Sequence, residues 1–322
     1  MTDVCFIGFD TSNYTTSAAV VDGEDRVIAN LKQPLAVADG EHGLRQSDAV
    51  FQHVKNLPLL AERLAPVLSG RTPLAVGVSE RPRDRDGSYM PCFLSGVAAA
   101  ANAAVLAGLP LYRFSHQSGH LMAAIVSARR FDLLDRPFYA YHVSGGTTEL
   151  LAVERTESGF DSTIVGGTRD LNAGQAIDRI GVALGVPFPA GPGLEQLALS
   201  YTGKIPKRKP AVTDGFVNLS GLENLALDLY RKTDDRAQVA AFVFAHLSSA
   251  ILTMTEQVFS KYGTRDLLCA GGVMSSTILR KAISDRFSAS FAEPALSSDN
   301  AVGIAALAAR AYRREKAGKE NP

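Results

Sequence analysis

The N-terminal third of the chain alternates between short apolar runs and a longer helical periodicity. Apolar runs at Val4–Phe9, Ser17–Val21 and Arg26–Lys32 are separated by small polar residues, which predicts three strands. Apolar residues recur at helical spacing over Ser47–Leu68, which predicts a helix. The same criteria then predict strands at Leu74–Val78 and Pro110–Phe114 and helices at Leu94–Leu109 and His116–Ala128.

The pattern restarts in the second half. Strands are expected at Tyr139–Val143 and Glu149–Glu154, on either side of a turn of small residues. Ile7–Val21 and Tyr141–Val153 share the order strand, polar turn with a Thr-Thr pair, strand, which indicates a weak internal repeat or two unrelated hairpins. Further helices are predicted at Ala173–Leu184, Gly193–Tyr201, Leu222–Lys232, Ala237–Lys261, Ser275–Ser284 and Asp299–Arg314, and strands at Asp266–Cys269 and Ser288–Ala292.

Alternating strands and helices predict an α/β protein. A chain of 322 residues suits two lobes, which we expect to span residues 1–133 and 134–322. Each lobe would open with a strand–turn–strand unit. Such units would bring two phosphate-facing turns together across a nucleotide cleft.

Charge and cysteine content narrow the functional classes. Lys plus Arg and Asp plus Glu both number 33, so no global field attracts nucleic acid, and RNA binding would need a local patch or a partner. Cys5, Cys92 and Cys269 are widely spaced, which predicts free thiols in a reducing cytoplasm. The sequence shows neither a signal peptide nor 18 consecutive apolar residues, so no membrane span is expected.

Two basic stretches are candidate phosphate contacts. They are Arg81–Arg85, with sequence RPRDR, and Lys204–Lys209, with sequence KIPKRK. Each is either a solvated loop or a contact to a phosphate backbone, such as that of tRNA.

Glycine pairs mark two candidate phosphate-binding elements. Ser144-Gly145-Gly146-Thr147 follows a predicted strand, and Ala270-Gly271-Gly272-Val273 lies between a strand and a helix. Backbone N–H groups at such positions can approach a phosphate closely. The first element alone could be an ordinary hairpin turn, but two of them, with Asp10 on a third turn, favour nucleotide binding.

Two further patterns suggest ligand contacts. His116 and His120 stand at i and i+4 and can chelate one metal from a single helix face, with capping or lining the helix start as the alternative. Gln117 replaces the glutamate of a zinc protease, so that class is disfavoured. Asp299 is the candidate third ligand or an N-cap. In Gly174–Glu195, Asp178 could bind ribose hydroxyls or be a solvated helix residue.

These motifs occur in an order that resembles one family. The order is DTS at Asp10–Ser12, HxxxH at His116–His120, VSGG at Val143–Gly146, GxAxD at Gly174–Asp178, PxGP at Pro189–Pro192, SGL at Ser220–Leu222, GGV at Gly271–Val273 and SDN at Ser298–Asn300. From about Phe6 to Ala309, the chain resembles the TsaD-type threonylcarbamoyladenosine synthase family, formerly called O-sialoglycoprotease or peptidase M22.

The resemblance implies an actin/hexokinase-like (ASKHA) ATPase fold, with two RNase H-like lobes around a nucleotide cleft. It also implies transfer of threonylcarbamoyl from threonylcarbamoyl-AMP to N6 of the tRNA adenosine beside the anticodon. The implied cofactors are one iron or zinc ion and ATP or threonylcarbamoyl-AMP.

The resemblance also implies roles for individual residues, according to their positions in the matching motifs. The implied metal ligands are His116, His120 and Asp299, with His142 as a candidate fourth, and Asp10 is a candidate catalytic residue. The implied nucleotide-binding residues are His142, Val143, Ser144, Gly145, Gly146, Thr147, Asp178, Gly191, Glu195, Gly271, Gly272 and Ser276.

Several positions depart from the family pattern, which predicts a divergent paralogue. Ser12–Thr16 replaces SCDET and removes two acidic residues, and Glu80–Phe93 replaces the GPGL turn. Thr147, Glu223 and Ser276 stand for the usual His, Lys and Asn. Three hypotheses follow: a tRNA threonylcarbamoyltransferase, an ATP-binding non-catalytic partner subunit, or a small-molecule carbamoyltransferase or kinase. A protein partner or homo-oligomer is expected in each case.

Overall fold

The computed structural model describes residues 3–12, 14–37, 44–156, 159–297 and 300–320. The chain forms two compact units. Unit 1 comprises Met1–Asp132, Arg155–Asp161 and Ala295–Pro322, and unit 2 comprises Leu133–Glu154 and Ser162–Pro294. Unit 2 begins at Leu133, and Ala295–Pro322, expected in the C-terminal lobe, belongs to unit 1 with the N-terminal residues.

Unit 1 is built on a five-stranded sheet with the order β3-β2-β1-β4-β5. Strands β1, β2 and β3 form an antiparallel meander, whereas β4 and β5 run parallel to β1. The strands are β1 (Asp3–Ser12), β2 (Thr15–Asp22), β3 (Val27–Pro34), β4 (Arg71–Arg81) and β5 (Leu111–Ser115). The helices of this unit are α1 (Gln46–Leu68), α2 (Phe93–Ala107), α3 (His116–Ala128) and α10 (Val302–Glu320), with a short 3-10 turn at Phe131–Leu134 and a short helix α9 (Pro294–Ser297).

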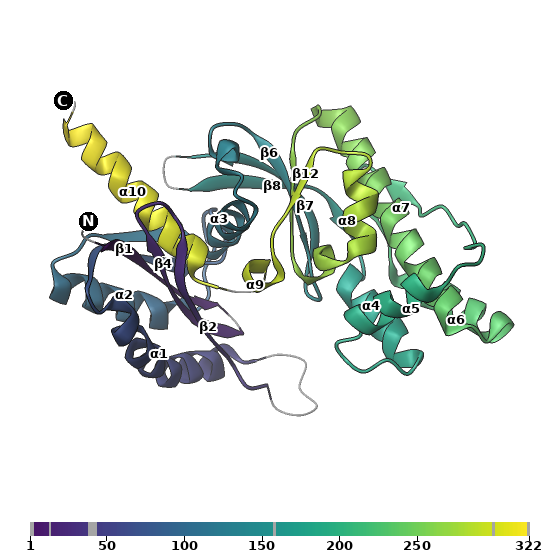
Figure 1. The fold of residues 1–322 in the computed structure, drawn as a ribbon, viewed down its shortest axis with the longest axis horizontal. Coiled ribbons are helices and arrows are strands. Elements are labelled where there is room, and N and C mark those ends of the chain that lie inside the picture. Colours follow the sequence, from purple (N-terminus) through teal and green to yellow (C-terminus); the bar gives the residue numbers. More distant parts are fainter. Residues whose placement is uncertain (1–2, 13, 38–43, 157–158, 298–299, 321–322) are drawn as a thin grey trace. The chain divides into compact units, whose positions relative to one another are not determined.

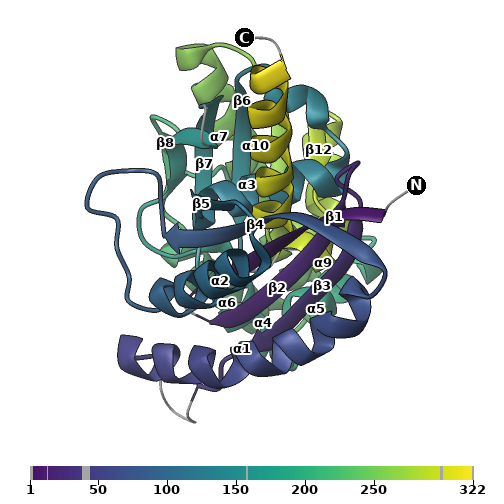
Figure 2. The same ribbon diagram turned by 90° about the vertical axis from the view of Figure 1, so that its left-hand side faces the viewer.

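Helices α1 and α2 cover one face of this sheet (Figure 2). Because side chains alternate along a strand, Cys5, Ile7 and Phe9 of β1 share one face. They form a buried apolar cluster with residues such as Leu60 of α1 and Ala100 of α2. The apolar residues of α1 that join this cluster recur at helical spacing, which is why the sequence pattern predicted the helix correctly.

Helix α10 lies along β1 and β4 on the other face (Figure 1). Glycines make this close approach sterically possible. A Cβ on Gly8 would lie 2.5 Å from the Ala301 carbonyl oxygen, and one on Gly77 would lie 2.7 Å from that of Ile304. A Cβ on Gly303 would lie 1.8 Å from the Gly119 carbonyl oxygen of α3. Gly8, Gly77 and Gly303 form a glycine seam that lets the C-terminal helix pack closely against unit 1.

Unit 2 is built on a seven-stranded sheet with the order β12-β11-β6-β7-β8-β10-β9. Strand β6 is antiparallel to β7 and parallel to β11, which is parallel to β12. The strands are β6 (Phe138–Val143), β7 (Thr148–Arg155), β8 (Phe160–Thr168), β9 (Val212–Thr213), β10 (Phe216–Val217), β11 (Leu267–Ala270) and β12 (Ala289–Phe291).

The two sheets repeat one strand order. In unit 1 the order is third, second, first, fourth, fifth, and the strands β8-β7-β6-β11-β12 repeat that order in unit 2. The hairpins β1–β2 and β6–β7 are both antiparallel and occupy the same place in their sheets. The similarity between Ile7–Val21 and Tyr141–Val153 therefore reflects an architectural repeat rather than two unrelated hairpins.

One apolar core joins the sheet of unit 2 to its helices. The core packs Tyr139, Tyr141 and Leu150 of the sheet against α4 (Ala173–Ala183), α5 (Gly191–Ser200), α6 (Ser220–Thr233), α7 (Arg236–Tyr262) and α8 (Thr277–Ser284). Helix α7 is long and apolar enough to cross a membrane, but 67% of its most apolar window is buried inside the protein, as in a core helix.

Strands β8, β9 and β10 were not predicted. Strand β8 carries a Gly-Gly pair and exposed residues in its middle, so it lacks a clean apolar alternation. Strands β9 and β10 have two residues each, too few to produce a pattern. Their places come from tertiary pairing: Phe216 of β10 lies opposite Gly167 of β8.

Candidate functional site

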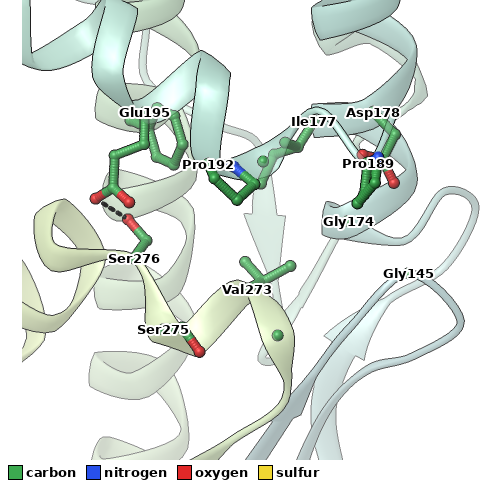
Figure 3. A pocket seen from close by; sticks show the side chains of 13 residues that line it. Gly145, Gly174, Ile177, Asp178, Pro189, Pro192, Glu195, Val273, Ser275 and Ser276 are labelled. Atoms are coloured by element: carbon green, nitrogen blue, oxygen red, sulfur yellow. Dashed lines mark hydrogen bonds between the residues drawn. The ribbon is translucent and has the colours of Figure 1, made fainter. Parts of the chain in front are cut away.

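A cavity of about 480 Å³ opens within unit 2 (Figure 3). It is bounded by the β6–β7 turn, by α4 and α5, by one residue of α7, and by the 3-10 turn Gly272–Ser275 that precedes α8. The lining residues are Gly145, Gly174, Ile177, Asp178, Pro189, Gly191, Pro192, Glu195, Phe244, Gly272, Val273, Ser275 and Ser276.

The walls of the cavity are largely apolar. Ile177, Pro192 and Val273 project toward the same space from three different elements (Figure 3). Volume and lining are those of a small-molecule site, where apolar walls hold a ligand and a few polar groups orient it.

Glycines shape the cavity in two different ways. A Cβ on Gly145 or Gly272 would meet no atom within 4 Å, so the backbone at both positions faces open space. A Cβ on Gly174 would lie 2.6 Å from the Ser144 carbonyl oxygen, so Gly174 lets α4 begin directly against the turn. Gly271 has a φ of +102°, and a Cβ there would lie 2.2 Å from the Val143 carbonyl oxygen.

Two carboxylates line the cavity. The Asp178 Oδ1 atom accepts a 2.8 Å hydrogen bond from the Ala190 backbone N–H, and Oδ2 makes no hydrogen bond to the described residues. The Glu195 Oε1 atom accepts hydrogen bonds from the Ser276 hydroxyl at 2.9 Å, the Thr277 hydroxyl at 2.8 Å and the Ile278 backbone N–H at 3.0 Å. Glu195 therefore caps the start of α8, while Asp178 keeps one oxygen for a ligand.

The structure gathers half of the predicted nucleotide-binding residues around this cavity. Those that line it are Gly145, Asp178, Gly191, Glu195, Gly272 and Ser276. Those outside its lining are His142, Val143, Ser144, Gly146, Thr147 and Gly271. His142 alternates with Tyr141, whose ring is buried in the core, and so lies on the other face of β6.

The apolar part of the cavity is not visible in the sequence. Ile177, Phe244 and Val273 carry no signal of their own, because apolar residues on helices and beside strands resemble core residues. Ile177 could have been suspected from its place next to Asp178. Phe244 lies 66 residues beyond Asp178 and meets the other lining residues only through the fold.

A separate polar cluster lies in unit 1 at the start of α3. Ser115 caps this helix by accepting a hydrogen bond from the Ser118 backbone N–H at 3.0 Å. The Nε2 atoms of His116 and His120 are 2.9 Å apart. The His116 Nδ1 atom lies 2.9 Å from Oδ1 of Asp10, a fully buried carboxylate that also accepts a hydrogen bond from the Ser79 hydroxyl.

The histidine pair fits a divalent metal ion. Two imidazole nitrogens 2.9 Å apart can both reach an ion at about 2.0–2.1 Å. A carboxylate on the other nitrogen of a metal-binding histidine is the usual orienting partner, and Asp10 occupies that place for His116. Among the described residues there is no group of three His, Cys, Asp or Glu around one point, and the predicted third ligand, Asp299, lies outside the described residues.

The predicted arginine loop is paired within the protein at its first arginine. Arg81 forms ion pairs with Glu80 and, at 2.7 Å, with Asp84. The second oxygen of Asp84 accepts hydrogen bonds from the Ser115 and Ser118 hydroxyls, so this carboxylate anchors the loop to the start of α3. Of the two interpretations of Arg81–Arg85, the geometry at Arg81 favours the structural one.

The architecture defines the class of protein. Two sheets of one repeated order form the fold of actin/hexokinase-like (ASKHA) ATPases, as predicted. Component A of the Acidaminococcus fermentans (R)-2-hydroxyglutaryl-CoA dehydratase is similar with a TM-score of 0.54 and 15% identity, over 96% of this chain and 99% of that one. HypF of T. kodakarensis has a TM-score of 0.60 and 13% identity, over 98% of this chain and 48% of that one.

Sequence comparison gives the particular family. Residues 48–306 match the model of TsaD, tRNA N6-adenosine threonylcarbamoyltransferase. A Geobacillus thermodenitrificans protein of that name is 31% identical, over 98% of this chain and 93% of the relative. One from Streptococcus suis is 29% identical, over 98% and 94%. The chain belongs to the TsaD family, which confirms the resemblance seen in its motifs.

Proposed function

We propose that this protein is a metal-dependent transferase that binds an adenine nucleotide in the cavity of unit 2 and transfers threonylcarbamoyl from its adenylate to N6 of a tRNA adenosine. The observation that carries the proposal is the cavity itself, which combines apolar walls, open glycine backbone and a carboxylate with a spare oxygen. Membership of the TsaD family supports the reaction.

Each part of an adenylate has a matching group in the cavity. The apolar walls formed by Ile177, Pro192 and Val273 suit a planar base. The spare oxygen of Asp178 suits a ribose hydroxyl. Phosphate suits the open backbone at Gly145 and Gly272, where no Cβ would block its approach.

The histidine cluster would hold the metal ion. His116 and His120 supply two nitrogens, Asp299 is the proposed third ligand, and a bound ion would act there as a Lewis acid toward an oxygen of the substrate. Asp10 accepts from His116 and sets its ring orientation, so we assign it as a positioning residue rather than a catalytic one.

The lost acidic pair keeps two alternatives open, a non-catalytic partner subunit and a transferase with a small-molecule acceptor. The positions between Ser12 and Thr16 now carry hydroxyl and amide side chains. Thr16 is buried, and its hydroxyl lies 2.9 Å from the Nδ1 atom of His53. This segment therefore supplies no carboxylate for the reaction, and activity would depend on the groups described above.

Exposed apolar side chains on α1 and α2 support a protein partner or a homo-oligomer. Phe51 and Val54 of α1 are 64% and 57% exposed, and Leu106 of α2 is 89% exposed. Burying such side chains in an interface is favourable. Light scattering on the purified chain would show whether it associates with itself.

One experiment separates the three functions. The full chain is supplied with threonylcarbamoyl-AMP and either unmodified tRNA or candidate small acceptors such as amines and amino acids, and product is measured by mass spectrometry. We expect modified tRNA, and we expect Asp178→Asn to lower its formation at limiting adenylate. Modification of a small acceptor alone would contradict the proposal and favour a small-molecule transferase. Nucleotide binding without transfer to any acceptor would favour the non-catalytic partner subunit.

A further inference from the structure

A second cavity lies in unit 2, on α7 and away from the residues that line the first. Its volume is about 440 Å³, and it is lined by Ile205, Pro206, Lys207, Arg208, Lys209, Phe242, Ala245, His246 and Ser249. The helix residues among these stand at i, i+3, i+4 and i+7, so they form one face of α7. Phe244, which lines the first cavity, lies about 200° around the helix from Phe242. The two cavities therefore lie on opposite faces of α7.

The rim of this cavity is positively charged. Tyr201–Pro210 contains four basic residues and no acidic one, in a chain whose net charge is zero. Lys207, Arg208 and Lys209 are exposed, and none of them forms an ion pair with a described residue. No described carboxylate lines the cavity, and Glu256, the single acidic residue of α7, pairs with Arg286. The rim is therefore available to an anion.

The floor of the cavity is apolar and contains a buried histidine. Phe242 is 4% exposed and His246 is 7% exposed, and their ring centroids are 6.0 Å apart. The His246 Nδ1 atom is buried without a hydrogen-bond partner among the described residues. A buried polar atom without a partner costs free energy, and a ligand donor placed in the cavity would remove that cost.

An inorganic phosphate or another small anion would use the charged rim alone. A nucleotide has both the anionic group that suits the rim and the flat, largely apolar base that suits the floor. The amino and hydroxyl groups of a nucleotide could donate a hydrogen bond to the His246 Nδ1 atom. Sites for single-stranded nucleic acid combine a basic groove with aromatic residues in the same way.

We infer that this second cavity binds one nucleotide of a single-stranded RNA segment, with the phosphate on Lys207 and Lys209 and the base against Phe242 and His246. The inference rests on the proposed function in identifying the RNA as the acceptor, and it gives that function a contact outside the adenylate cavity. The segment Lys204–Lys209 thus has the phosphate-contact role that the sequence left open.

The test measures binding of a labelled single-stranded RNA 12-mer to the full chain by fluorescence anisotropy at low salt. The single variant Lys207→Glu should weaken binding at least tenfold. The control Lys204→Glu changes the charge of the same segment outside the cavity lining and should weaken it less than threefold. Equal losses in the two variants would overturn the inference, because the segment would then act as a diffuse charge.

Competitors and a filled cavity test the chemistry. Duplex RNA of equal length, AMP and inorganic phosphate should each need at least a tenfold higher concentration than the unlabelled single strand to displace the labelled strand. Equal displacement by the duplex would show recognition of charge alone, and equal displacement by AMP would show a mononucleotide site; either result overturns the inference. Ala245→Trp should fill the cavity and lower RNA affinity, and unchanged affinity in this variant, once circular dichroism shows it folded, would also overturn it.

Cross-linking locates the RNA independently of folding defects. A single strand that carries 4-thiouridine should cross-link to residues 205–209 or 242–249, and cross-links confined to other segments would contradict the site. Binding of ATP to the first cavity, measured by calorimetry on the same variants, should not change. Loss of RNA binding with normal ATP binding would support the second cavity as the RNA site. Failure of the wild type to bind ATP would instead contradict the proposed function.

Discussion

At the scale of single residues, the two glycine elements differ in what they do. Gly145 faces open space, so Gly145→Val should fold normally and place its side chain where a phosphate would approach. We expect ATP binding to weaken by about 1–3 kcal/mol, the cost of leaving polar groups unpaired. Calorimetry with ATP measures this, and unchanged ATP affinity in the folded variant would contradict the placement of the phosphates.

Gly271 provides the matched comparison. Its positive φ and the 2.2 Å approach of a Cβ to the Val143 carbonyl oxygen mean that Gly271→Ala should destabilise the fold by about 1–3 kcal/mol. The expected signature is a lower melting temperature in the absence of any ligand. Gly145→Val should leave the melting temperature of the ligand-free protein nearly unchanged.

The buried thiols predict a loss of stability at alkaline pH. Burial raises the pKa of Cys92 to about 11 and that of Cys269 to about 12. The folded protein therefore keeps protons that the unfolded chain loses near pH 8.5–9, so this stability is complete below that pH and is lost as the pH rises toward 11–12. Urea denaturation between pH 8 and 10.5 should show the decline, and Cys92→Ala should reduce its slope. An identical slope in the variant would mean that other groups cause the decline.

At the scale of elements, the glycine seam under α10 should tolerate almost no added volume. Gly303→Ala places a Cβ 1.8 Å from the Gly119 carbonyl oxygen and should cost about 3 kcal/mol, toward the upper end for an overpacked core. Gly318→Ala, in the same helix, meets no atom and should be neutral or stabilising by about 0.5 kcal/mol. Denaturant unfolding of both variants measures this, and similar stabilities would contradict the packing of α10.

The sequence pattern predicts the helices and strands themselves better than it predicts which of them pack together. The predicted bounds of α1, α3 and α7 agree with the structure within one or two residues, and in α1 the buried residues recur at helical spacing. The pattern could not place α10 with unit 1, because the steric reason lies in glycines such as Gly8 and Gly77, whose positions matter only after folding. It likewise paired His116 with His120 through helical spacing, but it had no means of relating Asp10 to a residue 106 positions away.

At the scale of the whole molecule, metal and nucleotide should protect different segments. The histidine pair belongs to unit 1 and the adenylate cavity to unit 2. Hydrogen exchange should slow at the first turn of α3 on adding zinc or ferrous iron, and at residues 144–147 and the start of α4 on adding ATP. His116→Ala/His120→Ala should abolish metal content, measured by elemental analysis, and the metal-dependent protection, while the ATP effect persists. Wild-type metal content in this variant would remove the histidines from the metal site.

The return of the C-terminal helix to unit 1 has a consequence for synthesis on the ribosome. Unit 2 is encoded almost wholly between the two main parts of unit 1, so all its strands emerge before α10 does. Domains generally fold as units while the chain is being made. The α10 face of β1 and β4 must therefore stay uncovered while the residues between β4 and α10 are translated, and the sheet that β1 begins is covered on this face only once α10 has been made.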